Sequence, residues 1–150
     1  MKTRSYTVYK YKELSEEAKD QAIELHSNIN VDYEWWDYIY DDAKIIGLEI
    51  KEFDVYRGTI GGKLMESVGS VCKNIISQHG KCCDTYKLAQ QYYKGEYSKG
   101  EDSIGEFLHD LLEEYLVRLR KEYEYLTSRK AIEETFEAND YDFTENGEID

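Results

Sequence analysis

The sequence predicts an α+β fold, in which several helices surround one long core helix and a small antiparallel sheet completes a single domain over residues 1–150. Its 150 residues are 41% hydrophobic and 14% aromatic, an apolar content that a folded domain needs and that disordered acidic chains lack. Apolar residues recur more often at helical spacing than in strand-like alternation. The strand-like segments also do not alternate regularly with helices, which favours α+β over a parallel α/β architecture.

The N-terminal part of the chain predicts one strand and one helix. From Tyr6 to Tyr9, side chains of different character alternate with the period of two that is typical of a strand, here over residues 5–11. Ser15 can cap a helix, and the two glutamates that follow it suit the positive end of the helix dipole. The sequence therefore predicts a helix over residues 16–28.

A second helix is predicted over residues 33–46, closed by Gly47. Its apolar residues fall at steps of three, four and three and share one face: Trp36, Ile39, Ala43 and Ile46. Opposite that face, Glu34, Asp37 and Asp41 lie within about 60° of one another on the helical wheel. This acidic stripe has three interpretations: the solvated face of an amphipathic helix, a surface for a basic partner, or a divalent-cation site.

A β-hairpin is predicted next. In a strand over residues 48–56, Leu48 and Ile50 have one parity, whereas Phe53 and Val55 have the other. A bulge near residues 51–52 would place all these side chains on the core side. Glycine-containing turns bound a third strand over residues 59–65.

Helices dominate the second half of the chain. Shorter helices are predicted over residues 67–78 and 84–94, followed by a surface loop over 95–102. The clearest helix runs over residues 103–126. Its broad apolar face consists of Ile104, Phe107, Leu108, Leu111, Leu112, Tyr115, Leu116, Leu119, Tyr123 and Leu126.

The chain is predicted to close with a helix and a turn. A helix over residues 129–139 leads to a segment over 141–149 in which strand-like alternation precedes Asn146-Gly147, a dipeptide typical of hairpin turns. The first and last strands are candidates to meet in the sheet.

Negative charge is the strongest indication of function. The chain has 32 Asp and Glu against 19 Lys and Arg, a formal charge of −13. Residues 131–150 hold eight carboxylates and residues 31–43 hold five, both without a basic residue. Such a field repels phosphate backbones and favours basic partners. The basic residues near 118–130 are interleaved with glutamates, so we expect no direct binding of nucleic acid.

No membrane contact is expected. The apolar runs are far shorter than the ~20 residues that span a bilayer, and no apolar signal core follows the N-terminus. The sequence therefore predicts a cytoplasmic protein.

Motifs for catalysis are sparse. No nucleophile signature accompanies His26, His79 or His109, and the glycines of residues 58–62 lack the Lys-Ser/Thr ending of a phosphate-binding loop. We expect no catalytic residue and no cofactor.

The cysteines do not form a recognised metal motif. Cys72, His79, Cys82 and Cys83 have the spacing C-x6-H-x2-C-C, which matches no closed zinc pattern. Free thiols and no bound metal are the expectation.

Segments at both ends of the chain resemble a family of small acidic proteins that are common in phage and prophage genomes, some with a loose antitoxin-like label. The similar segments are Tyr11–Lys19 (YKELSEEAK), Asn30–Asp37 (NVDYEWWD), Asp42–Lys44 with Ile46–Leu48, and Glu137–Gly147 (EANDYDFTENG). The resemblance implies an accessory factor that binds and blocks a host component, and it supplies no catalytic residue.

The leading hypothesis is a non-enzymatic phage or mobile-element protein that inhibits a basic, nucleic-acid-handling host defence protein. Like an anti-CRISPR protein, it would use an acidic surface that mimics nucleic acid, in the cytoplasm of the host cell. The expected partner-binding residues are Glu34, Asp37, Asp41, Asp140, Asp142, Glu145 and Glu148. Two alternatives are an antitoxin that neutralises a partner toxin and a metal-assisted hydrolase that uses the clustered carboxylates.

Overall fold

A computed structural model describes residues 2–3, 5–97 and 102–150 and confirms the α+β class. In chain order the elements are β1 (Tyr9–Lys10), the 3₁₀ turn η1 (Tyr11–Glu13), α1 (Glu16–Leu25), α2 (Asp37–Ile45), β2 (Leu48–Asp54), β3 (Thr59–Leu64), α3 (Val68–Gln78), α4 (Asp84–Tyr93), α5 (Ser103–Leu126), α6 (Arg129–Ala138) and β4 (Asp142–Phe143). The loop predicted over 95–102 falls partly outside the described residues.

The chain folds into two compact units. The terminal unit consists of Met1–Trp35 and Tyr123–Asp150, and the central unit is Trp36–Glu122. The strands form two separate two-stranded antiparallel sheets, β1 with β4 and β2 with β3, where the sequence predicts a single sheet.

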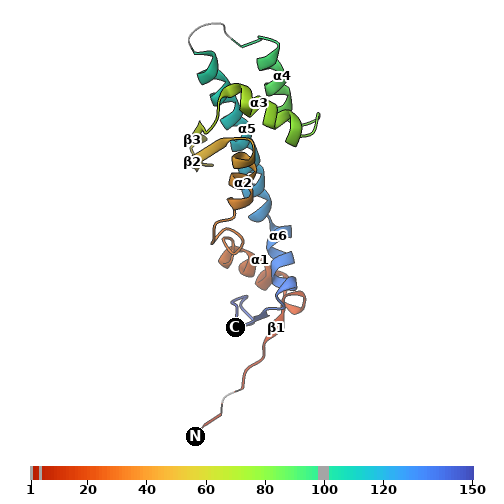
Figure 1. The fold of residues 1–150 in the computed structure, drawn as a ribbon. Coiled ribbons are helices and arrows are strands. Elements are labelled where there is room, and N and C mark those ends of the chain that lie inside the picture. Colours follow the sequence, from red (N-terminus) through yellow and green to blue (C-terminus); the bar gives the residue numbers. More distant parts are fainter. Residues whose placement is uncertain (1, 4, 98–101) are drawn as a thin grey trace. The chain divides into compact units, whose positions relative to one another are not determined.

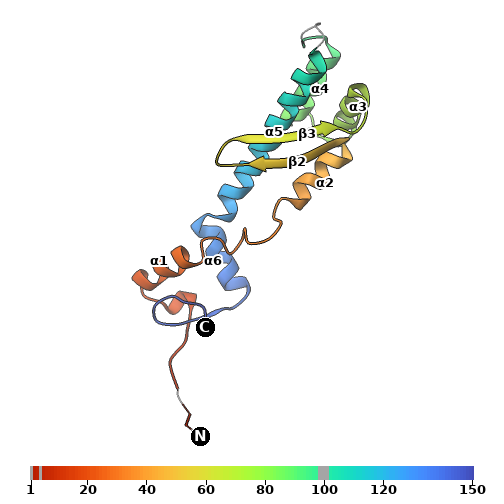
Figure 2. The same cartoon turned by 90° about the vertical axis from the view of Figure 1, so that its left-hand side faces the viewer.

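The terminal unit is closed by pairing between the two ends of the chain. Tyr9 lies opposite Phe143 and Lys10 opposite Asp142, which confirms that the first and last strands meet. Figures 1 and 2 show β1 and the C-terminal segment together beside α1 and α6. Beneath them, Phe143 and Phe136 pack edge-on with ring centroids 4.9 Å apart. The rest of this buried core comes from Tyr11, Leu14, Ala18, Ala22 and Ile132.

β1 is shorter than the strand predicted over residues 5–11. Its pairing ends at Lys10, whose backbone N–H donates to Glu13 Oε1 at 2.8 Å and so starts the turn η1. The turn places the Tyr11 ring 5.2 Å from the ring of Phe136. The chain therefore leaves the sheet because an aromatic side chain is buried in the core.

The central unit contains the β2–β3 hairpin, and its register shifts between Ile50 and Glu52, which confirms the predicted bulge. The hairpin lies against α5, since a Cβ atom on Gly62 would be 3.1 Å from the Leu112 side chain. Figure 2 shows the hairpin crossing α5. α2 packs against β2, and α3 packs against α4.

α2 begins at Asp37, four residues later than predicted. Trp35 is buried in the terminal unit, with its ring 5.7 Å from that of Tyr123. The next residue, Trp36, packs edge-on against Phe53 of the central unit at 5.7 Å. Because these neighbouring side chains enter different units, the helix starts only after them.

α5 has the predicted bounds, and its buried residues are Phe107, Leu111, Leu112, Tyr115, Leu116 and Leu119. Ile104, which the periodicity places on the same face, is 51% exposed. Ile104 lies in the first turn of the helix, and the buried part of α5 begins only at Phe107. Its place on the apolar face of the helical wheel is therefore not enough to bury it.

Removal of the Phe136 ring should strongly destabilise the protein. Phe136 is 1% exposed and contacts several rings, so Phe136→Ala should lower the free energy of unfolding by about 3–5 kcal/mol. Urea denaturation followed by circular dichroism would measure it. Leu25→Ala, at a side chain that is 47% exposed, should cost much less, and equal losses in the two variants would contradict this assignment of the core.

Candidate functional site

The predicted acidic stripe is not a single helical face. Glu34 precedes α2 and belongs to the terminal unit, whereas Asp37 and Asp41 are exposed on α2 in the central unit. The expectation of three carboxylates on one helix is therefore wrong, because Trp35 is buried in the terminal unit and the helix starts only at Asp37. Within the described part of the chain, no group of three or more His, Cys, Asp or Glu residues could hold a metal ion.

Much of the acidic C-terminal segment is paired with the N-terminus. Lys10 Nζ lies 2.7 Å from Asp142 Oδ1 and 3.3 Å from Asp140 Oδ2. The Tyr6 hydroxyl donates to Asp150 Oδ1 at 2.7 Å. Residues 131–150 contain no Lys or Arg, but the β1–β4 pairing places Lys10 next to their carboxylates. Glu145 and Glu148 form no ion pair among the described residues, so the four predicted tail carboxylates divide into a paired and an unpaired half.

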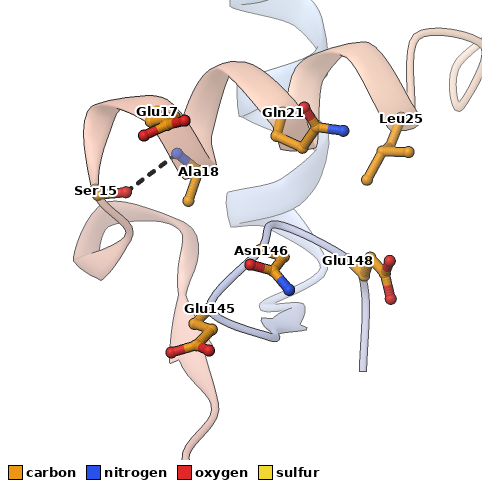
Figure 3. A pocket seen from close by; sticks show the side chains of 8 residues that line it. All are labelled: Ser15, Glu17, Ala18, Gln21, Leu25, Glu145, Asn146 and Glu148. Carbon is orange, nitrogen blue, oxygen red and sulfur yellow. Dashed lines mark hydrogen bonds between the residues drawn. The ribbon is translucent and has the colours of Figure 1, made fainter.

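The two tail carboxylates without an ion pair in the described ranges, Glu145 and Glu148, line a groove. Glu145, Asn146 and Glu148 of the C-terminal loop (residues 144–148) line one side of a hollow of about 410 Å³ next to α1 (Figure 3). The opposite side of the hollow consists of Ser15, Glu17, Ala18, Gln21 and Leu25. A second hollow of about 470 Å³ shares Ser15, Glu145 and Asn146 and continues to Tyr9, Glu13 and Leu14. We call the two together the terminal groove.

Short-range hydrogen bonds and one glycine fix the groove. The loop is a turn in which the Gly147 N–H donates to the Thr144 carbonyl at 3.0 Å and the Thr144 N–H donates to the Glu148 carbonyl at 2.8 Å. Gly147 has φ +84°, and a Cβ there would meet the Ala18 carbonyl oxygen at 2.5 Å. On the facing side, Ser15 Oγ accepts from the Ala18 N–H and starts α1. Gly147 therefore touches the α1 backbone directly and holds the loop in place.

The terminal groove is acidic and has apolar patches. Its carboxylates are Glu13, Glu17, Glu145 and Glu148, and no Lys or Arg is among the described residues that line it. Leu25 adds an apolar side chain that is 47% exposed. In the described part of the chain, the Glu13 carboxylate accepts a hydrogen bond from the Lys10 backbone N–H, and the other three carboxylates accept none. The groove can thus receive a cation that carries apolar atoms.

Charge is concentrated in the terminal unit. It has seven basic and sixteen acidic residues, a formal charge of −9, and the remaining −4 belongs to the central unit. Four of the seven bases, Lys10, Lys12, Lys19 and Arg129, already face carboxylates of the same unit at 2.6–3.8 Å. Among the described residues, the other carboxylates of the unit form no ion pair, so they carry the surplus charge.

The central unit holds a polar cluster that the sequence analysis missed. Asp42 Oδ2 accepts hydrogen bonds from the Tyr115 hydroxyl and from Arg118, both at 2.8 Å. His79 Nε2 lies 3.4 Å from the same oxygen without hydrogen-bond alignment, and its Nδ1 is 2.5 Å from Thr85 Oγ1. Tyr115 and Arg118 belong to α5, Thr85 belongs to α4, and His79 follows the end of α3. Because these positions are far from Asp42 in the sequence, spacing does not signal the cluster.

This cluster stabilises a charge and has no accessible nucleophile in its Thr–His–Asp chain. The His79 ring, followed by the hydrogen bonds from Tyr115 and Arg118, holds the pKa of Asp42 well below its usual range, although partial burial opposes this. Thr85 is 6% exposed, and its hydroxyl is engaged with His79 Nδ1. The arrangement ties α2 to α5.

The cysteines are free thiols. Cys72 is buried in α3, and burial raises the pKa of its thiol to about 11. Cys82 and Cys83 are exposed and lie beside the Asp42 cluster, along a hollow of about 480 Å³. At neutral pH, Cys72 is therefore a protonated core residue.

None of the helices in the described ranges combines the length and apolar character that crossing a bilayer requires. Comparison of the chain with protein-family models, with curated proteins and with solved structures finds no match.

Substitution of Gly147 should disturb the groove without changing its charge. Gly147→Ala combines an unfavourable positive φ with a close approach to the α1 backbone, so it should lower stability by about 2 kcal/mol or more. Chemical denaturation would measure the loss. Gly80→Ala is the control, because nothing lies within 4 Å of a Cβ there, and equal losses would contradict the close contact.

Asp42 should make stability depend on pH in acid. Its pKa is lowered on folding, so the ionised carboxylate stabilises the fold above the unfolded-state pKa of about 3.9, and this contribution is lost as the pH falls below that value. Wild type should exceed Asp42→Asn in stability at pH 7 and lose this advantage progressively in acid. Urea titrations across pH would test this, with exposed Asp41→Asn as the control. A pH-independent difference for Asp42→Asn would contradict the interpretation.

Proposed function

We propose that this protein is a non-enzymatic accessory factor that binds and inhibits a basic, nucleic-acid-handling protein through the acidic surface of its terminal unit. The observation that carries the proposal is the charge of −9 in this unit, together with the internal pairing of most of its bases. A mobile-element origin and a host defence protein as the target fit this chemistry, with the cytoplasm as the place of action.

Electrostatics supports a basic partner. A compact negative unit attracts a positive groove over distances of about a Debye length, roughly 8–10 Å at physiological salt, and accelerates association. Because Lys10, Lys12 and Arg129 are engaged with carboxylates, they are poorly placed to hold a phosphate backbone. Competition with nucleic acid for the same partner is thus favoured over binding to nucleic acid.

Exposed aromatic side chains add contacts that charge alone does not supply. Tyr6 and Tyr33 of the terminal unit are 70% and 62% exposed. Tyrosine is enriched at interface hot spots because it combines a large apolar ring with a hydroxyl. Side chains of this kind can occupy sites where the partner stacks bases.

The alternative of a metal-assisted hydrolase has less support. Its candidate ligands Glu34, Asp37 and Asp41 do not share one helical face, and Asp140 and Asp142 are already engaged with Lys10. An antitoxin would use the same acidic surface against a basic toxin, so the identity of the partner distinguishes it from a defence inhibitor.

Capture of a partner should depend on salt and be reversed by nucleic acid. The immobilised protein should retain a basic nucleic-acid-binding protein from nuclease-treated host lysate at about 50 mM NaCl and release it at about 300 mM, where charges are screened. Duplex DNA or RNA added at low salt should also displace the partner, because both ligands compete for the same basic surface.

Mass spectrometry would identify the retained protein, and an uncharged, inactive bead surface would be the control for adsorption. Retention that is insensitive to salt, or a partner that binds this protein and nucleic acid simultaneously, would contradict charge mimicry.

A further inference from the structure

The terminal groove has the dimensions of a short peptide site. Along α1, the distance from Glu17 to Leu25 corresponds to eight helical rises, about 12 Å. An extended chain advances about 3.3 Å per residue, so about four residues span this side of the groove. The second hollow continues beyond Ser15 to Tyr9, which leaves room for a longer segment.

The chemistry of the groove selects for a long cationic side chain. Figure 3 shows Glu17 and Glu145 toward one end of the first hollow and Leu25 with Glu148 toward the other, with Gln21 and Asn146 between them. The Gln21 and Asn146 amides can accept hydrogen bonds through their oxygens. An arginine offers five N–H donors on a long flexible stem, so it can reach both the carboxylates and the amides.

Leu25 supplies the apolar part of the site. It is 47% exposed at the end of α1, although it follows the apolar spacing of that helix. An apolar side chain two residues from the arginine of an extended ligand can pack on it, because residues i and i+2 of a strand-like segment point to the same face.

We propose that the terminal groove binds an extended, arginine-bearing segment of a protein partner, with a guanidinium held by carboxylates of α1 and of the C-terminal loop and an apolar side chain two residues away on Leu25. This inference rests on the proposed function and specifies where the partner is held. Binding then depends on charge complementarity within a defined hollow, in addition to the general negative field of the unit.

An NMR titration with a defined peptide tests the site. The probe is an acetylated and amidated hexapeptide with arginines at its first and fifth positions and a leucine at its third, so that all three side chains point to one face, and its control carries citrulline in place of both arginines. The arginine peptide should shift the backbone amides of Gln21, Leu25 and Gly147, and the citrulline peptide should bind at least tenfold more weakly, because citrulline keeps the shape but loses the charge.

Two triple variants of equal net charge distinguish binding in the groove from attraction by the general negative charge of the unit. Glu17→Gln/Glu145→Gln/Glu148→Gln should weaken binding of the arginine peptide at least tenfold. The matched variant, Glu24→Gln/Asp32→Asn/Glu124→Gln, neutralises three exposed carboxylates of the same unit that do not line the groove, and it should bind within about threefold of wild type. Proton–nitrogen correlation spectra would verify that both variants are folded.

Several outcomes would overturn the proposal. These are equal losses in the two triple variants, amide shifts centred away from the groove, and spermidine producing the same shifts as the peptide at the same concentration. Salt-sensitive capture of the partner by the groove variant would leave the proposed function intact and remove only the groove. Peptide binding without any captured basic partner would support the groove and remove the proposed function.

Discussion

The antiparallel pairing of Tyr9–Lys10 with Asp142–Phe143 is the constraint on which the terminal unit depends. This unit consists of the first and last segments of the chain, and the whole central unit lies between them in sequence. Bringing such distant segments together costs loop-closure entropy, which grows slowly with the length of the intervening chain. Two residue pairs cannot offset this cost, so the stabilisation comes from the aromatic core of Tyr11, Phe136 and Phe143 beneath them.

The same closure sorts the charges of the unit. Lys10 arrives opposite Asp142 because of the strand register, and Arg129 lies between Asp20 and Glu133 because α6 packs on α1. Exposed ion pairs of this kind contribute little to stability, at most about 1 kcal/mol each. Their larger effect is on the surface, since they engage four bases of the unit and leave the groove carboxylates among the exposed charges that form no ion pair in the described part of the chain.

Much of the fold follows from local patterns in the sequence. The limits of α5, the Ser15 cap and the bulge in β2 each depend on residues that are close to one another in the sequence. Periodicity and capping chemistry therefore predict them.

The start of α2 and the Asp42 cluster were not predictable in this way. Trp35 and Trp36 are apolar neighbours whose separate burial depends on the tertiary structure, and Asp42 meets residues from distant helices. The groove is intermediate, because Asn146-Gly147 marks the turn but only the packed structure shows that the turn rests on α1.

The division between the tryptophans also gives each unit its own optical reporter. Trp35 is the sole tryptophan of the terminal unit and Trp36 the sole one of the central unit, because the chain contains two. Indole emission depends on local polarity, so Trp35→Phe and Trp36→Phe chains each have a fluorescence signal that reports on one unit. Coincident transitions in the two chains would indicate cooperative unfolding, whereas separate transitions would show that the units unfold independently.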